Sequence, residues 1–193
     1  MTAPILRDFP FQFETERLLI RGPLPGDGQP VRDAVIESQP ELKQWLPWAV
    51  DIPSATEYEV IVRQGQLKFL AREDMWLLLF LKESGRFVGG SGLHRPNWAV
   101  PSFEIGYWVR TSLVGRGYIT EAVNGITRFA FDTLAARRVE IQCDSRNVRS
   151  AAVARRCGYD LEGPLRQDGR HHLDNSLRDT LIFAKIQPDL PAA

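Results

Sequence analysis

One segment, residues 103–122, restricts the fold of this chain more than any other. Residues 103–110 have the pattern of a strand, the loop behind them carries Gly115 and Gly117, and an amphipathic helix follows at about 120–134. Glycine allows the backbone to turn sharply, so a strand can pass almost directly into a helix at this point. The segment therefore predicts a strand and a helix that belong to one α/β domain.

The same turn is a candidate anion site. Its backbone N–H groups can converge on one point, and the helix N-terminus adds about half a positive charge, a combination that suits a pyrophosphate. Arg110 and Arg116 could add charge-assisted contacts. The alternative is a tight turn that binds nothing. The loop is neither a Walker A motif nor a complete dinucleotide fingerprint, since Thr120 stands in place of the third glycine.

The remaining elements are indicated by changes in hydrophobic period. After a loose N-terminal arm, a short helix is expected to end before Pro40, and Ser54 with Glu57 predicts a capping box for the next helix. Further strands are expected at 17–21, 75–81, 86–93, 139–143, 159–166 and 180–186, and a late helix at 148–157 with Gly158 behind it. This order predicts a mixed α/β sheet covered by helices.

Charge and cysteine content disfavour several classes of function. The 24 Lys and Arg residues balance the 24 Asp and Glu residues, so the chain has no long-range attraction to nucleic acid or to an anionic membrane. Its apolar runs fall far short of the roughly 20 residues that span a bilayer. Cys143 and Cys157 have no metal-ligand partners at zinc-like spacing. We therefore expect a cytoplasmic protein without a metal, whose chemistry takes place in a cleft.

Four motifs occur in a fixed order along the chain. They are Glu104-Ile-Gly-Tyr-Trp, Val114-Gly-Arg-Gly-Tyr-Ile-Thr-Glu-Ala122, Asn147-Val-Arg-Ser150 and Cys157-Gly-Tyr159. In order and spacing they resemble the GNAT superfamily of N-acetyltransferases, specifically its RimJ/RimL type. The segments 16–21 and 178–183 are similar to the same subgroup. The resemblance covers nearly the whole chain.

The resemblance implies a fold and a donor. The implied fold is a mixed, mostly antiparallel central sheet of about 6–7 strands, flanked by helices and splayed open at the donor site. One acetyltransferase domain would span residues 13–187, between an N-terminal arm, 1–12, and a C-terminal tail, 188–193. The implied donor is acetyl-CoA, with its pantetheine along the strand edge at Tyr107, Trp108 and Val109. Its pyrophosphate would bind the turn at Val114, Gly115, Arg116, Gly117, Tyr118, Ile119 and Thr120.

A second constellation follows the strand that is expected to end near Asp144. Asn147 and Ser150 fall at the start of the next helix, one turn apart and on one side. In the family pattern the Asn amide holds the pantetheine, and the Ser is the candidate acid that protonates the departing thiolate. Both residue types also favour helix caps, so a capping role stays open for either.

Acetyl transfer to an amine needs a base, because alkyl amines are mostly protonated at pH 7. Glu104 is the first candidate, since it lies on the strand that leads to the donor site, and its alternative is a paired structural carboxylate. His94, at the end of the preceding strand, is the second candidate, with a structural role as its alternative. A backbone N–H near Val109 is expected to stabilise the tetrahedral oxyanion.

The sequence does not indicate the acceptor. A protein N-terminal α-amine and a small amine both fit. Aromatic candidates for a pocket are Trp45, Trp48, Tyr58, Trp76, Trp98 and Trp108, of which about two are expected to line it and the others to lie in the core or an interface. Two other classes stay open: a non-catalytic regulator that binds acyl-CoA on the same fold, and a module that binds nucleic acid or protein through the Arg-rich stretch 137–170. The neutral composition disfavours the module that binds nucleic acid or protein. The expected partners are acetyl-CoA and an amine, without nucleic acid or membrane, and a homodimer is compatible with the sequence.

Overall fold

The structure is a computed structural model and describes residues 3–187. Its strands are β1 (Gln12–Glu14), β2 (Leu18–Arg21), β3 (Met75–Leu81), β4 (Phe87–Asn97), β5 (Ser102–Val109), β6 (Arg138–Asp144), β7 (Asp160–Arg170) and β8 (Leu177–Ile186). Its α-helices are α1 (Gly28–Leu42), α2 (Ala55–Ala71), α3 (Tyr118–Asp132) and α4 (Val148–Arg156). Short 3₁₀ turns are η1 (Pro4–Leu6), η2 (Pro47–Ala49) and η3 (Thr111–Leu113).

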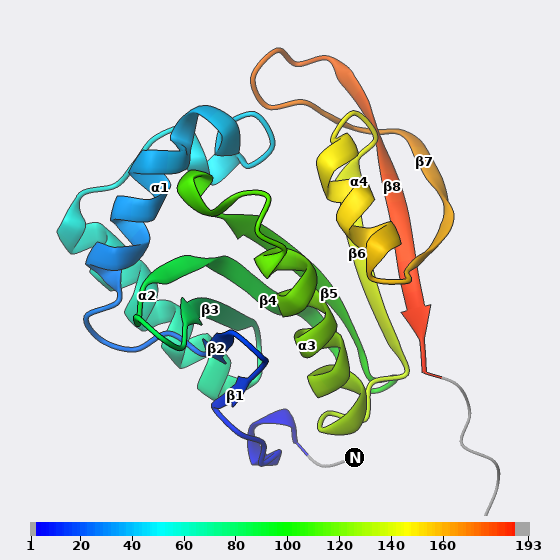
Figure 1. Cartoon of the computed structure of the whole chain (residues 1–193). Coiled ribbons are helices and arrows are strands. Elements are labelled where there is room, and N and C mark those ends of the chain that lie inside the picture. Colours follow the sequence, from blue (N-terminus) through cyan, green and yellow to red (C-terminus); the bar gives the residue numbers. More distant parts are fainter. Residues whose placement is uncertain (1–2, 188–193) are drawn as a thin grey trace, which may run out of the picture.

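Within these residues the eight strands form one sheet in the order β1-β2-β3-β4-β5-β6-β8-β7. Neighbouring strands are antiparallel except β5 and β6, and helices flank the sheet (Figure 1). The predicted fold class, a mixed and mostly antiparallel sheet covered by helices, is confirmed. The strand count exceeds the expectation because β1, which pairs with β2, was not predicted.

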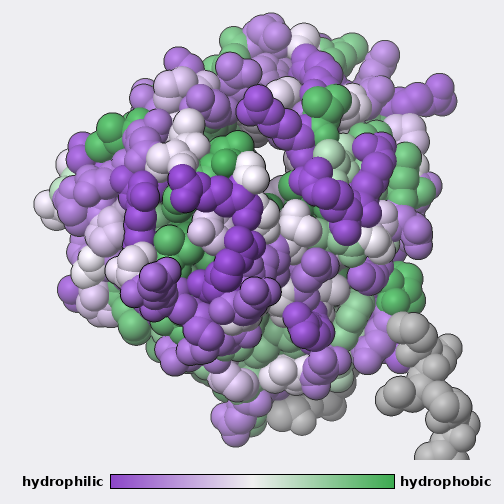
Figure 2. Space-filling view, viewed as in Figure 1, coloured by the Kyte–Doolittle hydropathy of each residue, from purple (hydrophilic) through white to green (hydrophobic). Residues whose placement is uncertain are grey.

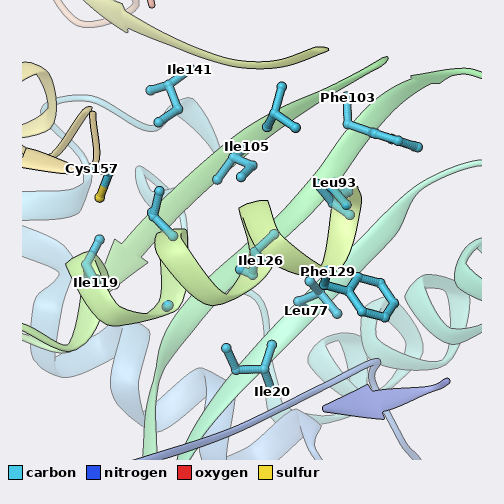
Figure 3. Close-up of a cluster of buried hydrophobic side chains, with 14 of the residues drawn as sticks. Ile20, Leu77, Leu93, Phe103, Ile105, Ile119, Ile126, Phe129, Ile141 and Cys157 are labelled. Carbon is cyan, nitrogen blue, oxygen red and sulfur yellow. The ribbon is translucent and has the colours of Figure 1, made fainter. Parts of the chain in front are cut away.

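Strand β3 is apolar at every position because it is buried on both faces. Leu77 and Leu79 belong to the hydrophobic cluster under α3, whereas Leu78 and Phe80 belong to the cluster formed with α1 and α2. Successive side chains of a strand point to opposite faces, so a strand buried on both faces carries apolar residues throughout. Figure 3 shows the α3 side of this core, where the helix lies across Leu77 and its neighbours on the sheet.

The sheet opens between β5 and β6. Their parallel pairing covers only Ser102 with Arg138, Phe103 with Val139 and Glu104 with Glu140. Beyond Glu104, β5 continues to Val109 along β4, while β6 continues to Asp144 along β8. The edge of β5 from Ile105 onward therefore has no strand beside it among the described residues, as the predicted splay requires.

Two local expectations were wrong. Helix α1 does not end before Pro40 but continues to Leu42. Proline cannot donate to the carbonyl of residue 36, four residues earlier. We attribute the tolerance of Pro40 to its place in the last helical turn, close to the end of α1 at Leu42.

The N-terminal arm is packed rather than loose from Phe9 onward. The Phe9 and Phe11 rings both lie edge-on to Phe69, and Phe13 stacks on Phe129 with 4.5 Å between ring centroids. Burying three alternating aromatic rings favours an ordered segment. The proposed C-terminal tail, 188–193, and the first two residues of the arm lie outside the described residues. No helix among residues 3–187 is long and apolar enough to cross a bilayer.

Candidate active site

The turn before α3 has the backbone conformation that the sequence predicted. Gly115 and Gly117 have φ angles of 80° and 79°, in the region that glycine adopts without strain. A Cβ atom built on Gly115 would meet no atom within 4 Å. The position therefore favours glycine because of its positive φ angle and not because of a lack of space. Residues 114–117 are exposed at the N-terminus of α3. The turn thus has the features of a helix N-terminal anion site.

A polar cluster connects the start of α3 to the turn between β1 and β2. The Glu121 carboxylate accepts hydrogen bonds from the Thr15 hydroxyl at 2.6 Å, the Arg17 backbone N–H at 2.7 Å and Arg17 Nε at 2.6 Å. Arg17 also donates to the carbonyl oxygen of Arg116 at 3.1 Å. Burial by itself would raise the pKa of Glu121, but the Thr15 and Arg17 contacts lower it. The cluster fixes the loop backbone before any ligand arrives, a role that sequence reasoning missed.

A second set of contacts anchors the other end of the loop to α1. Arg110 Nε lies 2.5 Å from Glu37, and the same carboxylate accepts the Ser112 N–H at 2.9 Å. Burial would raise the pKa of Glu37, but hydrogen bonds from Ser112 and the Arg110 charge bring it down to about 2. Arg110 was a candidate for contacting the phosphates. In the structure its guanidinium is instead paired with Glu37 of α1. Arg116 is exposed in the loop.

Across the opening of the sheet, β5 contacts α4 through Tyr107 and Ser150. The Tyr107 hydroxyl lies 2.9 Å from the Ser150 carbonyl oxygen and 3.1 Å from Ser150 Oγ. Burial raises the pKa of Tyr107, so its hydroxyl is protonated at neutral pH. Asn147 caps α4, because its Oδ1 accepts the Ser150 N–H at 3.0 Å. Asn147 therefore caps the helix through its side-chain oxygen. Its side-chain NH₂ group is the part that could still bind a ligand.

On the other face of β5, a cavity of about 510 Å³ lies between the sheet and helices α1 and α2. Its aromatic walls include Trp48, Trp76 and Trp108, and its sheet side includes Gly90 and Gly106. Residues 106–108 of β5 line this cavity and also belong to the part of β5 that β6 does not pair with, so the cavity borders the open edge of β5. In Figure 2 the surface is hollowed between the part that carries α1 and the part that carries α4.

The two candidate bases lie in different surroundings. His94 lines the cavity, and its Nδ1 is 3.0 Å from each carboxylate oxygen of Asp74. Glu104 is opposite His94 in the sheet register but is not among the cavity residues, and Arg95 Nη1 lies 2.5 Å from its Oε2. Burial raises the pKa of Glu104, although the Arg95 charge opposes the shift.

Trp48, Tyr58, Trp76 and Trp108, which were among the aromatic candidates for a pocket, all line this cavity, but sequence reasoning missed Asp74. Asp74 precedes an apolar strand, where it has the pattern of an ordinary strand boundary. Its pairing with His94 depends on how β4 lies beside β3, where Met75 pairs with Leu93. No local signal of residue type or spacing points to that contact.

Residues 17–160 match the family described as acetyltransferase (GNAT) domain. The chain is 30% identical over 162 residues to YdaF of Bacillus subtilis (strain 168), provisionally named a ribosomal N-acetyltransferase; the match covers 81% of this chain and 87% of YdaF. It is 27% identical over 158 residues to the ribosomal-protein-serine acetyltransferase of Escherichia coli (strain K12), covering 82% and 86% of the two chains.

Solved structures share the fold. The microcin C7 self-immunity acetyltransferase MccE, in complex with acetyl-CoA and AMP, superposes with a TM-score of 0.85 at 19% identity, over 93% of this chain and 98% of MccE. RimL, the ribosomal L7/L12 α-N-protein acetyltransferase in complex with coenzyme A, gives a TM-score of 0.80 at 24% identity, over 92% and 96%. At these identities the likeness concerns the fold.

Proposed function

Since this chain belongs to the acetyltransferase (GNAT) family, we propose that its acceptor is the N-terminal α-amine of a protein. The chain is an acetyl-CoA-dependent N-acetyltransferase. The names of the two relatives, which refer to ribosomal proteins, support a protein acceptor. We place the reaction in the cytoplasm, where ribosomal proteins are made. A homodimer is compatible with the proposal and is not needed for it.

The proposal is carried by residues 106–108, which line the cavity and also form the open edge of β5. A donor that enters from the α3 side and an acceptor that enters from the α1–α2 side would meet there, on opposite faces of one strand. The cavity, about 510 Å³, lies within the usual range for small-ligand pockets and could take the first residue of a peptide. A single amine could thus attack a thioester held at the strand edge.

The donor would bind through backbone groups. The pyrophosphate of acetyl-CoA would lie on the N–H groups of residues 114–120, at the N-terminus of α3. The pantetheine would run along Tyr107, Trp108 and Val109, whose edge β6 leaves open. The Asn147 amide could add a hydrogen bond from α4. The exposed loop, its two positive φ angles and its anchors at Glu121 and Glu37 support this placement.

The chemistry would proceed by direct attack. The amine nitrogen forms a bond to the acetyl carbon, the C–S bond breaks, and the Val109 N–H stabilises the oxyanion between these steps. Ser150 would protonate the departing thiolate, supported by the Tyr107 hydroxyl beside its Oγ. Glu104 and His94 are the candidate bases that remove the amine proton.

An acceptor panel tests the proposal. Peptides that begin with Ser, Ala or Met, the same peptides with a blocked N-terminus, a polyamine and an aminoglycoside are each supplied with acetyl-CoA, and release of the CoA thiol is followed. We expect turnover with free N-terminal peptides and none with blocked ones. Turnover confined to the polyamine or the aminoglycoside would reject a protein acceptor and leave the transferase activity in place. CoA binding without turnover of any amine would instead favour a non-catalytic regulator.

A further inference from the structure

We infer that Asp74 positions His94 as the base that accepts the proton of the acceptor amine. This inference rests on the proposed function, because it concerns the amine that enters the cavity. His94 belongs to β4, and Asp74 lies in the turn that joins α2 to β3. Both side chains are half-buried and both line the cavity.

The contact between the two side chains fixes the histidine tautomer. Both carboxylate oxygens of Asp74 lie 3.0 Å from His94 Nδ1. An ionised carboxylate can only accept hydrogen bonds, so Nδ1 carries the proton and donates it. In a neutral imidazole the other nitrogen, Nε2, then has its lone pair available. Nε2 has no hydrogen-bond partner among residues 3–187.

The ring lies close to the reacting strand. A Cβ atom built on Gly92 would lie 2.5 Å from His94 Nε2, and one built on Gly106 would lie 3.5 Å from it. The imidazole thus lies over two glycines of neighbouring strands. A side chain larger than glycine at position 92 would clash with it. Gly106 directly precedes Tyr107, the first residue of the proposed donor edge. The Nε2 lone pair is therefore beside the place where the acetyl group would be presented.

The rival carboxylate lacks this arrangement. Glu104 is engaged by Arg95 and lies outside the cavity lining. Its charge nevertheless acts on His94 from the neighbouring strand, as does Asp74 from the β3 side. Lys68 of α2 opposes them from across the cavity, and Glu140 of β6 adds negative charge behind Glu104. Arg95 and Arg138 pair with these last two carboxylates, which leaves Asp74 as the carboxylate in direct contact with the imidazole.

The step balances without a further reactant. The acceptor ammonium transfers one proton to His94 Nε2, and the neutral amine forms the C–N bond. Collapse of the tetrahedral species breaks the C–S bond, the amide nitrogen loses its second proton, and the thiolate of CoA takes up a proton. The imidazolium, stabilised by Asp74, returns its proton to solvent. The products are the acetylated amine and CoA.

Asp74→Asn, Asp74→Glu and His94→Gln test the inference by steady-state kinetics across pH with the best acceptor of the panel. For His94→Gln we expect kcat to fall by about 10²–10⁴-fold, the usual contribution of a general base. For Asp74→Asn we expect a fall of at least about tenfold, since an Asn amide that donates to Nδ1 would leave Nε2 protonated. The acid limb of the kcat/KM profile should move to lower pH, because the variant lacks the charge that stabilises imidazolium.

Three further readouts separate positioning from structural support. Asp74→Glu should recover part of kcat, and the Kd for acetyl-CoA should stay unchanged in every variant. Asp174→Asn is the matched control, because Asp174 contacts His171 Nδ1 at 3.2 Å in the β7–β8 hairpin, outside the cavity lining. It should leave kcat and the pH profile unaltered. A purely structural Asp74 would lower the melting temperature without moving the acid limb.

A measurement that needs no acceptor keeps the inference testable by itself. Nitrogen-15 NMR of the imidazoles should show the Nδ1–H tautomer for His94 in the wild-type protein and its loss in Asp74→Asn. A wild-type Nε2–H tautomer would overturn the inference. So would full kcat in His94→Gln together with loss of the acid limb in Glu104→Gln. In that last case the acetyltransferase function would stand with Glu104 as its base.

Discussion

The Tyr107 hydroxyl reaches from β5 to α4 and lies 2.9 Å from the carbonyl oxygen of Ser150 and 3.1 Å from its Oγ. This contact spans the opening in the sheet at the level where residues 106–108 meet the cavity. One pair of side chains therefore joins the two halves of the proposed donor groove. It also places two hydroxyl groups together where a thiolate would leave.

Tyr107→Phe removes one hydroxyl of this pair and should lower kcat more than it alters acetyl-CoA binding. The lost hydrogen bond leaves Ser150 Oγ without its neighbour, and we expect kcat to fall about tenfold, which corresponds to the net value of one hydrogen bond. Ser150→Ala should have a similar effect if the serine protonates the thiolate. Stopped-flow kinetics and acetyl-CoA titration of each variant provide the check.

Tyr159→Phe is the matched control for that change. The Tyr159 hydroxyl pairs with Thr127 Oγ1 at 2.6 Å, fully buried between α3 and the segment after α4. Its loss should destabilise the protein by about 1 kcal/mol, the usual net value of a hydrogen bond, with kcat unchanged. Equal losses of kcat in both variants would show that Tyr107 acts through stability.

Gly115→Ala should weaken acetyl-CoA binding. An alanine at φ 80° is strained by about 1–2 kcal/mol, and relief of that strain would turn the loop N–H groups away from the pyrophosphate. We expect the Kd for acetyl-CoA to rise about tenfold, measured by calorimetry.

Gly85→Ala separates binding from strain. Gly85 has φ 67°, and, as at Gly115, a Cβ atom there would meet nothing within 4 Å. It lies in the β3–β4 turn, away from the proposed donor site. Both variants should lose similar stability to urea, but only Gly115→Ala should bind acetyl-CoA less tightly. Unchanged binding in Gly115→Ala would remove the loop from the donor site.

Glu37→Gln should destabilise the protein in a pH-dependent way. The pKa of Glu37 is lowered from 4.5 to about 2 in the folded state, so its charged contacts with Ser112 and Arg110 favour folding above pH 4.5. That contribution declines as pH falls from 4.5 toward 2. Because the carboxylate is partly exposed and screened by solvent, we expect a difference of about 1 kcal/mol at pH 7.

Urea unfolding of wild type and Glu37→Gln at several pH values measures this difference. The gap between the two should be constant above pH 5 and narrow below pH 4.5. Glu83→Gln, at an exposed position in the β3–β4 turn, should show no such gap. A gap for Glu37→Gln that widens toward acid would contradict the assigned direction of the pKa shift.

The sequence was informative where a feature is local and contiguous. Gly115, Gly117 and the helix behind them lie within a few residues, so the turn and its conformation could be predicted. Strand β3 could be predicted for the same reason, since its apolar run reflects burial on both faces. Helix α1 was predicted too short because Pro40 was taken as a helix stop, whereas it lies in the last turn of a helix that ends at Leu42.

The cavity's aromatic residues were among the sequence candidates, but their convergence on one site could not be predicted in this way. Asp74 and His94 meet because β3 and β4 pair in a particular register, and Trp48, Trp76 and Trp108 come from three separate elements. Such contacts depend on tertiary packing, which leaves no fixed spacing in the chain. The proposed acceptor site therefore depends on the fold, whereas the proposed donor loop is recognisable from a short motif.

The central claim is that this chain moves an acetyl group from acetyl-CoA to an α-amine. Mass spectrometry of a free N-terminal peptide, incubated with the protein and acetyl-CoA, tests it most directly. We predict one acetyl group per peptide, located at the α-amine by fragmentation, in step with CoA release and formed about tenfold more slowly by Ser150→Ala. CoA release without acetylated peptide, or no modification at saturating acetyl-CoA with any amine of the panel, would contradict the claim.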